Sequence, residues 1–428
     1  MRPGNGATLA VHLEVAQTWP DVMSVLASET FREEYWAQRP FLANAPAVAG
    51  CFSVDSIRAA AARNELLAGQ NAFLEGPEAR SFAKHPGLRR GAALTSEVLE
   101  SGLRNATLVL NDASAAWANL SEIAVAATRK LGLPTSVNAY VTGHALPQSA
   151  PAHTDRQDVL VVQCEGRKRW RVYGPPVPFP AEHQERGKSG DVLSPESLGP
   201  TLLEADLQPG DLLYVPRGFA HATERAAGWA PEEAAKACEE PGVCEAELGS
   251  GFSTSLAVGI QTESAGLTYD KLLLCSLFLN GDGLSVEELR SLTTSHVLLR
   301  QPLPLPGSLA GAPVASALAD AALARAAEKL REAWPASGSA AAPPPAARLR
   351  RAGEILAEGH AGMLRGYEAQ FDAAAPRRLR QELWSRRAAA LVQRMLGRCG
   401  FLTKCHAAKF WLPKHTTHKR CWQGQSES

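Results

Sequence analysis

A β-hairpin pattern at residues 159–173 constrains the fold of this chain more than any other feature. Val159 to Cys164 is an apolar run rich in β-branched residues, and Arg167 to Tyr173 alternates between basic and apolar residues. Glu165 and Gly166 between them are typical of a turn. The pattern predicts two antiparallel strands that have a wet face and an inner face.

Lys168 falls on the inner face of the second strand. Successive side chains of a strand point to opposite faces, so the three arginines at 167, 169 and 171 face water. Lys168 then points inward beside Trp170 and Val172. Because lysine is almost never fully buried unless it is paired, Lys168 requires an anion. That anion is either a bound ligand or a structural Asp or Glu.

His153, Asp155 and His221 are candidate metal ligands. His153 and Asp155 are two residues apart, so they share one face of a strand, and His221 follows the strand pattern of residues 210–216. We expect the third ligand to come from a facing strand. Two imidazoles and one carboxylate are the ligand set of non-haem Fe(II) oxygenases, which leaves other positions open. By itself, a His-x-Asp tripeptide is also common in turns and in surface ion pairs.

Asn138 and Tyr140 are candidates for the same cavity. The segment Ser136 to Thr142 alternates, which places both side chains on one face, opposite Val137 and Val141. The alternative for Tyr140 is a buried hydroxyl that only satisfies a backbone carbonyl.

Residues 138–173 and 209–224 together resemble the JmjC cupin core of the ribosomal oxygenases, a protein-hydroxylating branch of the 2-oxoglutarate dioxygenases. Residues 31–42 and 108–112 are similar to segments that precede this core, so the resemblance covers roughly residues 20 to 275. It implies an α+β protein built on a double-stranded β-helix, the cupin barrel, with flanking helices and a helical carboxy-terminal half.

The resemblance also implies roles for the candidate residues. His153, Asp155 and His221 would bind Fe(II), and the distal carboxylate of 2-oxoglutarate would be held by Lys168, with Asn138 and Tyr140 completing that pocket. Dioxygen is the second cosubstrate. The sequence departs from its relatives at Ser255 and Ala257, where they usually carry a histidine and a threonine. This departure affects cosubstrate contacts and substrate preference, and it leaves the iron ligands intact.

The function implied by the resemblance is hydroxylation of a histidine or arginine side chain in a ribosomal protein. Three alternatives stay open: a JmjC histone lysine demethylase, a non-catalytic cupin that binds a ribosomal or chromatin partner, and a metal-dependent sugar isomerase. The expected location is the nucleus or nucleolus by family analogy, with the cytoplasm as the alternative.

Length and composition exclude several classes of protein for this chain. With 428 residues and 45% hydrophobic residues, we expect two or three domains with substantial cores. The 44 basic and 44 acidic residues cancel, so no global attraction to nucleic acid is expected. No apolar run is long enough to cross a membrane, and the first residues lack the apolar core of a secretory signal. Eight scattered cysteines favour a reducing compartment.

The domain boundaries follow from changes in pattern along the chain. Residues 1–265 are predicted to form the catalytic cupin domain with its amino-terminal extension. Residues 266–334 resemble a helical dimerisation region, so a homodimer is expected, although the same apolar stripes suit an intramolecular core. Residues 335–347 are expected to form a Pro- and Ala-rich linker. Residues 348–428 are expected to be helical, and the resemblance implies that they form a divergent winged-helix-like region.

Smaller features carry further expectations. Thr30 and Glu33 read as a capping box for a helix that ends before Pro40, and residues 120–131 read as a second helix. The insertion at residues 226–250 is expected to be a surface loop, with substrate gating as the alternative. The Cys- and His-bearing tail after residue 398 either binds zinc or is a divergent terminus.

Two polar residues near the candidate ligands have open roles. Asp158 is either a solvated loop acid or a substrate contact. Arg217 either ties its turn to a neighbouring acid or meets an incoming peptide.

Overall fold

The computed structural model describes residues 11–12, 18–76, 83–84, 89–103, 106–143, 146–180, 184–188, 191–226, 251–262, 268–278, 300 and 346–368. These residues fall into two compact units. The first unit comprises Met1–Ala126 and Thr135–Ile260, and the second comprises Ala127–Pro134 and Gln261–Ser428. The candidate site residues all belong to the first unit.

The larger of two β-sheets in the first unit has nine strands. Its pairs are antiparallel except for the parallel pair β1–β2. The strands are, in order across the sheet, β1 (Val11–His12), β2 (Phe41–Asn44), β11 (Asp211–Val215), β8 (Asp158–Glu165), β13 (Phe252–Ile260), β6 (Thr135–Gly143), β5 (Thr107–Leu110), β3 (Ala72–Gly76) and β4 (Ala83–Lys84).

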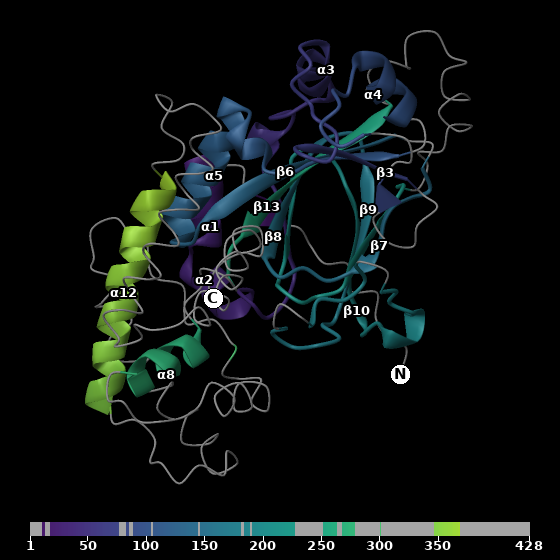
Figure 1. Ribbon diagram of the computed structural model, residues 1–428. Coiled ribbons are helices and arrows are strands. Elements are labelled where there is room, and N and C mark those ends of the chain that lie inside the picture. The colour runs from purple at the N-terminus through teal and green to yellow at the C-terminus, as the bar shows by residue number, and fades with distance from the viewer. Residues whose placement is uncertain are drawn as a thin grey trace, which may run out of the picture. The chain divides into compact units, whose positions relative to one another are not determined.

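The smaller sheet has four antiparallel strands and faces the larger one. Figure 1 shows β6, β13 and β8 on one side of the barrel and β9 and β7 on the other. This arrangement of two facing antiparallel sheets is the predicted double-stranded β-helix. The strands of the smaller sheet are, in order, β10 (Thr201–Leu207), β9 (Lys168–Tyr173), β12 (His221–Glu224) and β7 (Gln148–His153).

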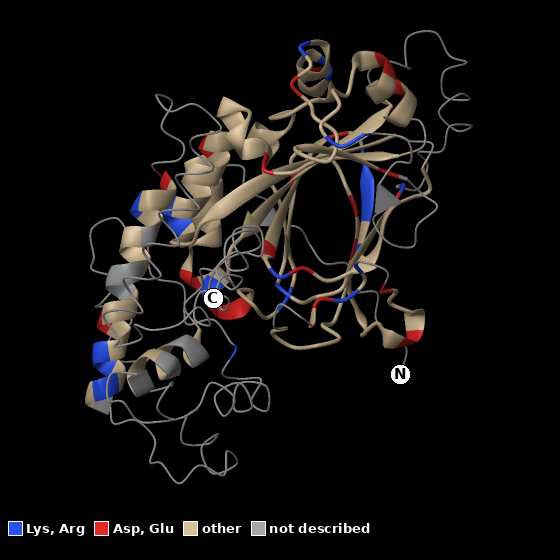
Figure 2. Cartoon of the chain, viewed as in Figure 1, with Lys and Arg blue, Asp and Glu red and all other residues tan. Residues whose placement is uncertain are grey.

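The predicted turn and alternation are observed at residues 159–173, but the predicted pairing of the two strands is wrong. β8 pairs with β11 and β13 in the larger sheet, whereas β9 pairs with β10 and β12 in the smaller sheet, because the chain crosses from one sheet to the other at the turn. Gly166, in the turn between β8 and β9, has a φ of +60°, a conformation that glycine adopts without strain. On β9, Lys168, Trp170 and Val172 are buried, and the residues between them are partly exposed. Figure 2 shows the basic residues that mark this strand.

The outer face of β9 forms an ion-pair ladder with its neighbours. Arg169 makes a bidentate contact with Asp206 on β10, with N···O distances of 2.7 and 2.8 Å. Arg171 lies between Glu204 on β10 and Glu224 on β12. These pairs are a third to a half exposed, so they contribute to strand pairing and little to stability.

Two capped helices open the first unit. Helix α1 (Trp19–Leu26) begins at a capping box in which Thr18 and Asp21 bond each other's backbone N–H. Helix α2 (Glu29–Glu34) is capped by Ser28, whose hydroxyl accepts from the N–H of Phe31. The predicted cap at Thr30 is therefore wrong, because an N-cap residue needs an extended backbone and Ser28 supplies it two residues earlier.

The other helices in the described part of the chain lie beside the barrel or belong to the second unit. The predicted helix at 120–131 is observed as α5, two residues longer at its start. The helices are α3 (Val54–Ala62), α4 (Ser96–Leu103), α5 (Ala118–Leu131), α8 (Tyr269–Phe278) and α12 (Ala346–Glu368), with short 3-10 turns η1 (Pro46–Val48), η2 (Ala113–Ala115) and η4 (Pro195–Ser197).

The second unit is described at α8, α12 and the end of α5. The buried His360 on α12 contacts the carbonyl of Gly132 through Nε2, at 2.5 Å. Several predictions fall outside the described residues: most of the insertion at 226–250, most of the dimerisation region at 266–334, the linker at 335–347 apart from its last two residues, and the tail after residue 398. The proposed domain boundaries and the homodimer stay predictions.

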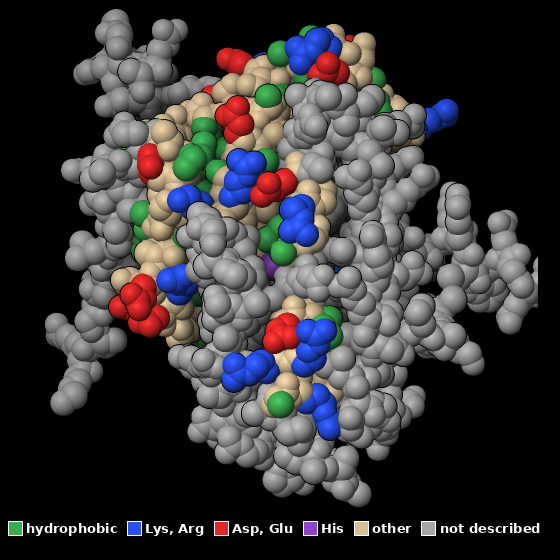
Figure 3. Space-filling view, turned by 90° about the vertical axis from the view of Figure 1, so that its left-hand side faces the viewer, with side chains coloured by type: hydrophobic (Ala, Val, Ile, Leu, Met, Phe, Trp, Pro, Cys, Tyr) green, Lys and Arg blue, Asp and Glu red, His purple; other side chains and the backbone are tan. Residues whose placement is uncertain are grey.

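The surface shows interspersed charges. On the face drawn in Figure 3, basic and acidic side chains alternate over short distances. None of the helices in the described part of the chain combines the length and the apolar character that a membrane span requires.

Candidate metal centre

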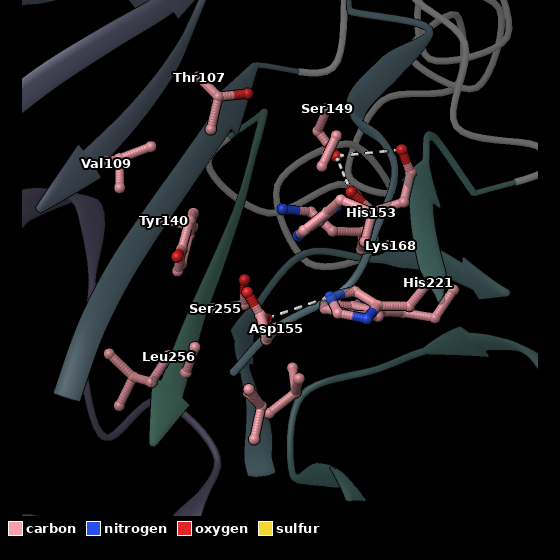
Figure 4. Close-up of a pocket in the computed structure, with 16 residues that line it drawn as sticks. Thr107, Val109, Tyr140, Ser149, His153, Asp155, Lys168, His221, Ser255 and Leu256 are labelled. Atoms are coloured by element: carbon pink, nitrogen blue, oxygen red, sulfur yellow. Dashed lines mark hydrogen bonds and ion pairs between the residues drawn. The ribbon is translucent and has the colours of Figure 1, made fainter. Parts of the chain in front are cut away.

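His153, Asp155 and His221 converge at one end of the smaller sheet. His153 is the last residue of β7, His221 is the first residue of β12, and the two are register partners. Asp155 lies two residues beyond the end of β7. One ligand atom from each side chain lies within 4.8 Å of the others, and the side chains point toward one another (Figure 4).

The structure corrects two details of the predicted geometry. Asp155 does not share a strand with His153, because β7 ends at His153 and the chain turns away there. The backbone of Thr154 pairs instead with Arg186, whose carbonyl accepts from the Thr154 N–H at 3.0 Å. The third ligand, His221, comes from the neighbouring strand of the same sheet and not from a facing strand.

Backbone contacts fix which nitrogen of each histidine faces the centre. Nδ1 of His153 lies 2.8 Å from the carbonyl of Pro151, and Nδ1 of His221 lies 3.1 Å from the carbonyl of Phe219. A carbonyl oxygen only accepts, so each Nδ1 carries the hydrogen and each Nε2 presents a lone pair. This is the tautomer that a metal-binding histidine needs, with its other nitrogen held by an acceptor.

Burial and neighbouring charges keep the set ready to bind a cation. Burial, assisted by His221, lowers the pKa of His153 to about 3, so this imidazole is neutral at physiological pH. Burial alone would raise the pKa of Asp155, but Lys188 and the two histidines hold it well below its usual range. The neutral imidazole of His153 and the ionised carboxylate of Asp155 have the protonation states that divalent metals bind. The three residues therefore fit a divalent metal ion.

Lys188 is a residue of this centre that the sequence pattern did not reveal. Its Nζ donates to Oδ1 of Asp155, and it also contacts Oε1 of Glu185 at 2.9 Å. The opposite oxygen of Asp155, Oδ2, lies 3.4 Å from Nε2 of His221. The two carboxylate oxygens therefore face different partners.

A pocket between the two sheets contains the three ligands. It measures about 570 Å³, including the part open to solvent, which is within the usual range for small-molecule sites. Both sheets contribute polar and apolar side chains to its wall (Figure 4). The lining residues are Thr107, Val109, Tyr140, Ser149, Ala150, His153, Asp155, Val159, Val161, Lys168, Trp170, His221, Thr223, Ser255, Leu256 and Ala257.

Lys168 is the buried cation in this pocket. Its side chain is 4% exposed, and its Nζ donates to the hydroxyl of Thr142 at 3.2 Å, which in turn lies 3.1 Å from the hydroxyl of Thr107. Burial lowers the pKa of Lys168 to about 8. Among the ion pairs found within the described residues, none joins Lys168 to a carboxylate. This observation favours a bound anion over a structural acid.

Thr142 could have been found from the sequence. It is two residues beyond Tyr140 on β6, so the alternation that placed Asn138 and Tyr140 on one face also places Thr142 there.

Tyr140 and Asn138 hold different positions. Tyr140 lines the pocket, and burial, followed by the charge of Asp155, raises its pKa to about 12, so its hydroxyl stays protonated. Asn138 is not among the lining residues. Its Oδ1 accepts from the N–H of Asp112 at 2.8 Å, and its side chain hydrogen-bonds the Tyr140 hydroxyl. Asn138 therefore contacts the pocket through Tyr140.

Ser255 and Ala257 both line the pocket, so the departure from the relatives changes its wall. On the other sheet, the hydroxyls of Ser149 and Thr223 lie 2.7 Å apart. The side chains of Ser255 and Ala257 are smaller than the histidine and the threonine that the resemblance leads us to expect at these two positions.

Asp158 is neither a solvated acid nor a pocket residue. It is 1% exposed and accepts hydrogen bonds from the hydroxyl of Tyr214 and from the backbone N–H of Arg217. Tyr214 also accepts from the N–H of Ala37, so this network joins the amino-terminal segment to the barrel. The role expected for Asp158 in solvent or at substrate is wrong, because long-range packing buries it.

Comparison with known protein families decides the identity of the barrel. The model of the JmjC domain matches residues 117–230, a range that includes the three candidate ligands, Lys168 and Lys188. Residues 117–230 are similar to a JmjC domain. The JmjC cupin resemblance read from the sequence is thereby confirmed, and with it the double-stranded β-helix fold.

Curated proteins that are similar to this chain include ribosomal oxygenases. Ribosomal oxygenase 1 of Gallus gallus is 32% identical over 203 residues, which cover 46% of this chain and 32% of the relative. Ribosomal oxygenase 2 of Rattus norvegicus is 41% identical over 93 residues, covering 22% and 18%. The bifunctional lysine-specific demethylase and histidyl-hydroxylase NO66 of Drosophila persimilis is 27% identical over 210 residues, covering 48% and 29%. The chain thus spans about a third or less of the length of these relatives.

Among solved structures, the chain is similar to Escherichia coli ribosomal oxygenase YcfD. The match has a TM-score of 0.36 and 17% sequence identity, and covers 81% of this chain and 70% of that chain.

Proposed function

We propose that this chain is an Fe(II)- and 2-oxoglutarate-dependent oxygenase that hydroxylates a side chain of a ribosomal protein. One observation carries the proposal. Two imidazoles and a carboxylate converge within 4.8 Å in a pocket that also contains a buried lysine. A protein that binds a metal without catalysis does not need a buried lysine to hold a cosubstrate carboxylate.

The metal ligands account for the first half of the proposed mechanism. His153 and His221 would each offer Nε2, and Asp155 would offer Oδ2, the oxygen that faces His221. Three ligands leave three of six positions open, which suits a cosubstrate that binds through two oxygens together with dioxygen. With these bound, Fe(II) supplies the oxidising chemistry: 2-oxoglutarate, dioxygen and a C–H bond become succinate, carbon dioxide and a C–OH group.

The pocket wall accounts for the second half. Lys168 would bind the distal carboxylate of 2-oxoglutarate, with Thr142 fixing its Nζ. The protonated hydroxyl of Tyr140 would donate to an oxygen of the cosubstrate. Apolar side chains such as Val161 and Leu256 line the same space and exclude water from the reacting atoms.

The substrate class rests on the relatives. Both ribosomal oxygenases named above support a ribosomal protein, and a histidine or arginine side chain follows from the resemblance. The bifunctional demethylase and hydroxylase supports a second candidate, demethylation of a histone lysine. A nuclear or nucleolar location and a homodimer are further proposals that rest on the family resemblance alone.

The decisive experiment measures succinate production and peptide modification together. The protein is loaded with iron anaerobically and exposed to air with 2-oxoglutarate and panels of ribosomal-protein and methylated histone peptides. Gain of one oxygen on a ribosomal peptide supports the hydroxylase, and loss of a methyl group with formaldehyde release supports the demethylase. If neither iron nor 2-oxoglutarate binds, the oxygenase proposal is wrong and a binding module remains.

A further inference from the structure

Lys188 contacts the carboxylate of the candidate metal-binding set. Its ammonium donates to Asp155, the carboxylate of the candidate metal set, and to Glu185 on its other side. All three side chains are only about a quarter exposed, at 27%, 25% and 24%. Solvent therefore screens this cluster less than it screens an exposed ion pair.

The segment that carries Lys188 is fastened to the backbone of the ligands. Arg186 and Thr154 exchange two hydrogen bonds, from N–H to carbonyl at 3.0 Å and from N–H to hydroxyl at 2.9 Å. Gly187 lies so close to the end of β7 that a Cβ there would be 2.6 Å from the Cα of His153. Lys188 follows immediately, so its backbone position is set by the chain that bears the ligands.

A second anchor holds this segment from the other side. Asp191 accepts from the guanidinium of Arg186 at 2.7 and 3.2 Å and from the N–H of Gly187 at 2.8 Å. Two independent sets of contacts thus hold the residues that precede Lys188.

The two carboxylate oxygens of Asp155 have different partners. Lys188 binds Oδ1, and Oδ2 faces Nε2 of His221, where the ligand atoms converge. A carboxylate with one oxygen held by an ammonium has one oxygen left for a metal. A carboxylate without that restraint is able to chelate through both.

The number of bound oxygens decides what else fits around the ion. With one oxygen from Asp155, the protein fills three of six positions, and a bidentate 2-oxo acid and dioxygen fill the rest. With two oxygens from Asp155, only two positions stay open, and the 2-oxo acid and dioxygen compete for them.

We propose that Lys188 is a positioning residue that restricts Asp155 to single-oxygen metal coordination and so keeps a third coordination position open. The inference rests on the proposed metal site. Glu185 serves Lys188 in turn, because it also accepts a hydrogen bond from the ammonium and offsets its charge near a bound cation. Arg156 lies 3.7 Å from Glu185 and extends the cluster to the surface.

The test uses Co(II) in place of iron, because its visible absorption bands depend on the number and geometry of its ligands. The full-length protein is stripped of metal, titrated with Co(II) and then titrated with 2-oxoglutarate. Lys188→Met removes the charge and keeps the length of the side chain, while Lys188→Arg keeps the charge. Lys130→Met, on α5 and outside the pocket lining, is the matched control.

We expect Lys188→Met to shift the visible absorption bands of bound Co(II), both before and after 2-oxoglutarate is added, because the second oxygen of Asp155 is then free to join the ion. Lys188→Arg should retain the wild-type spectrum at least in part, and Lys130→Met should retain it fully. Melting temperatures measured without metal show whether each variant is folded.

Two results would overturn the inference: a Lys188→Met spectrum that superimposes on that of the wild type, or equal changes in Lys130→Met. Failure of the wild-type protein itself to bind Co(II) is a different result, because it removes the proposed function together with this inference.

Discussion

The three candidate ligands differ in how the protein holds them. Each histidine donates through Nδ1 to a carbonyl two residues earlier in its own chain segment, at Pro151 and Phe219. Asp155 instead depends on Lys188, which is 33 residues away in the sequence. The orientation of the imidazoles is therefore a local property, whereas the orientation of the carboxylate is a property of the folded chain.

Removing a ligand should abolish metal-dependent turnover and spare the fold. We expect His153→Ala and Asp155→Ala to reduce succinate formation to background, because two remaining ligands do not hold Fe(II) firmly. Gln148→Ala, at the exposed start of the same strand, is the control and should keep full activity. Circular dichroism of each variant checks the fold, and residual iron-dependent turnover in both ligand variants would contradict the assignment.

Lys168→Ala should raise the 2-oxoglutarate requirement. Loss of a charge-assisted contact costs about 1.5–3 kcal/mol, which corresponds to a roughly 10- to 150-fold higher KM for 2-oxoglutarate. The measurement is succinate formation against 2-oxoglutarate concentration, with Lys130→Ala as the control. An unchanged KM would show that Lys168 has another role.

The lowered pKa of Lys168 also predicts a pH dependence. Its pKa of about 8 means that the free protein loses this positive charge as the pH rises from 7 to 9. Because 2-oxoglutarate needs the protonated form, its affinity should fall about tenfold over that range. His153, with a pKa of about 3, does not titrate there. Lys168→Arg keeps the charge, so the loss of affinity should be absent in this variant when binding is measured by calorimetry.

At the scale of elements, two strand ends and one segment between strands build the centre. β7 delivers His153 at its last residue, β12 delivers His221 at its first, and residues 184–188 pack against the end of β7. Strand ends suit this purpose, because the paired part of each strand fixes the side chain while the end leaves room for a ligand. Residues 184–188 reach the end of β7 because Gly187, which has no side chain, lies directly against its backbone.

Gly187→Ala should therefore disturb the centre. A Cβ there would lie 2.3 Å from the carbonyl oxygen of Ala152, and the residue has a φ of +76°. We expect a loss of about 1–3 kcal/mol in the free energy of unfolding and weaker Co(II) binding. Gly50→Ala is the control, since Gly50 has a similar φ of +68° and nothing within 4 Å of the added Cβ. Equal effects of the two variants on Co(II) binding would show that the contact is unimportant.

At the scale of the molecule, all of the site residues belong to one compact unit. That unit combines both sheets, while the described part of the second unit consists of helices. Ligand binding should therefore stabilise the first unit directly. Acidic and basic residues occur in equal numbers, so the stabilisation should come from the pocket and not from long-range charge.

Metal and cosubstrate together should raise the melting temperature. At a free concentration of 100 times Kd, binding adds about 2.7 kcal/mol to the stability of the state that binds. Differential scanning calorimetry with Co(II) and 2-oxoglutarate measures the shift, and Asp155→Ala provides the control. An equal shift in that variant would place metal binding elsewhere in the chain.

The sequence by itself determined the features that depend on local alternation. The alternation at residues 168–173, the inward direction of Lys168 and the shared face of Asn138 and Tyr140 follow from the two-residue period of a strand. That β8 and β9 belong to different sheets was decided by the tertiary structure. The resemblance to the JmjC family added the barrel and the roles of the ligands. These features were predictable because each depends on the pattern of residues within a short segment of the chain.

Only the tertiary structure decided which distant groups meet. In the folded chain Lys188 donates to Asp155, and the buried Asp158 accepts from the hydroxyl of Tyr214. Asn138 contacts Tyr140 and does not line the pocket itself. In each case the partners are brought together by strand pairing or by a close backbone approach that no local pattern encodes. The same side chains in another register would face solvent, so their roles depend on the fold and not on their own sequence neighbourhood.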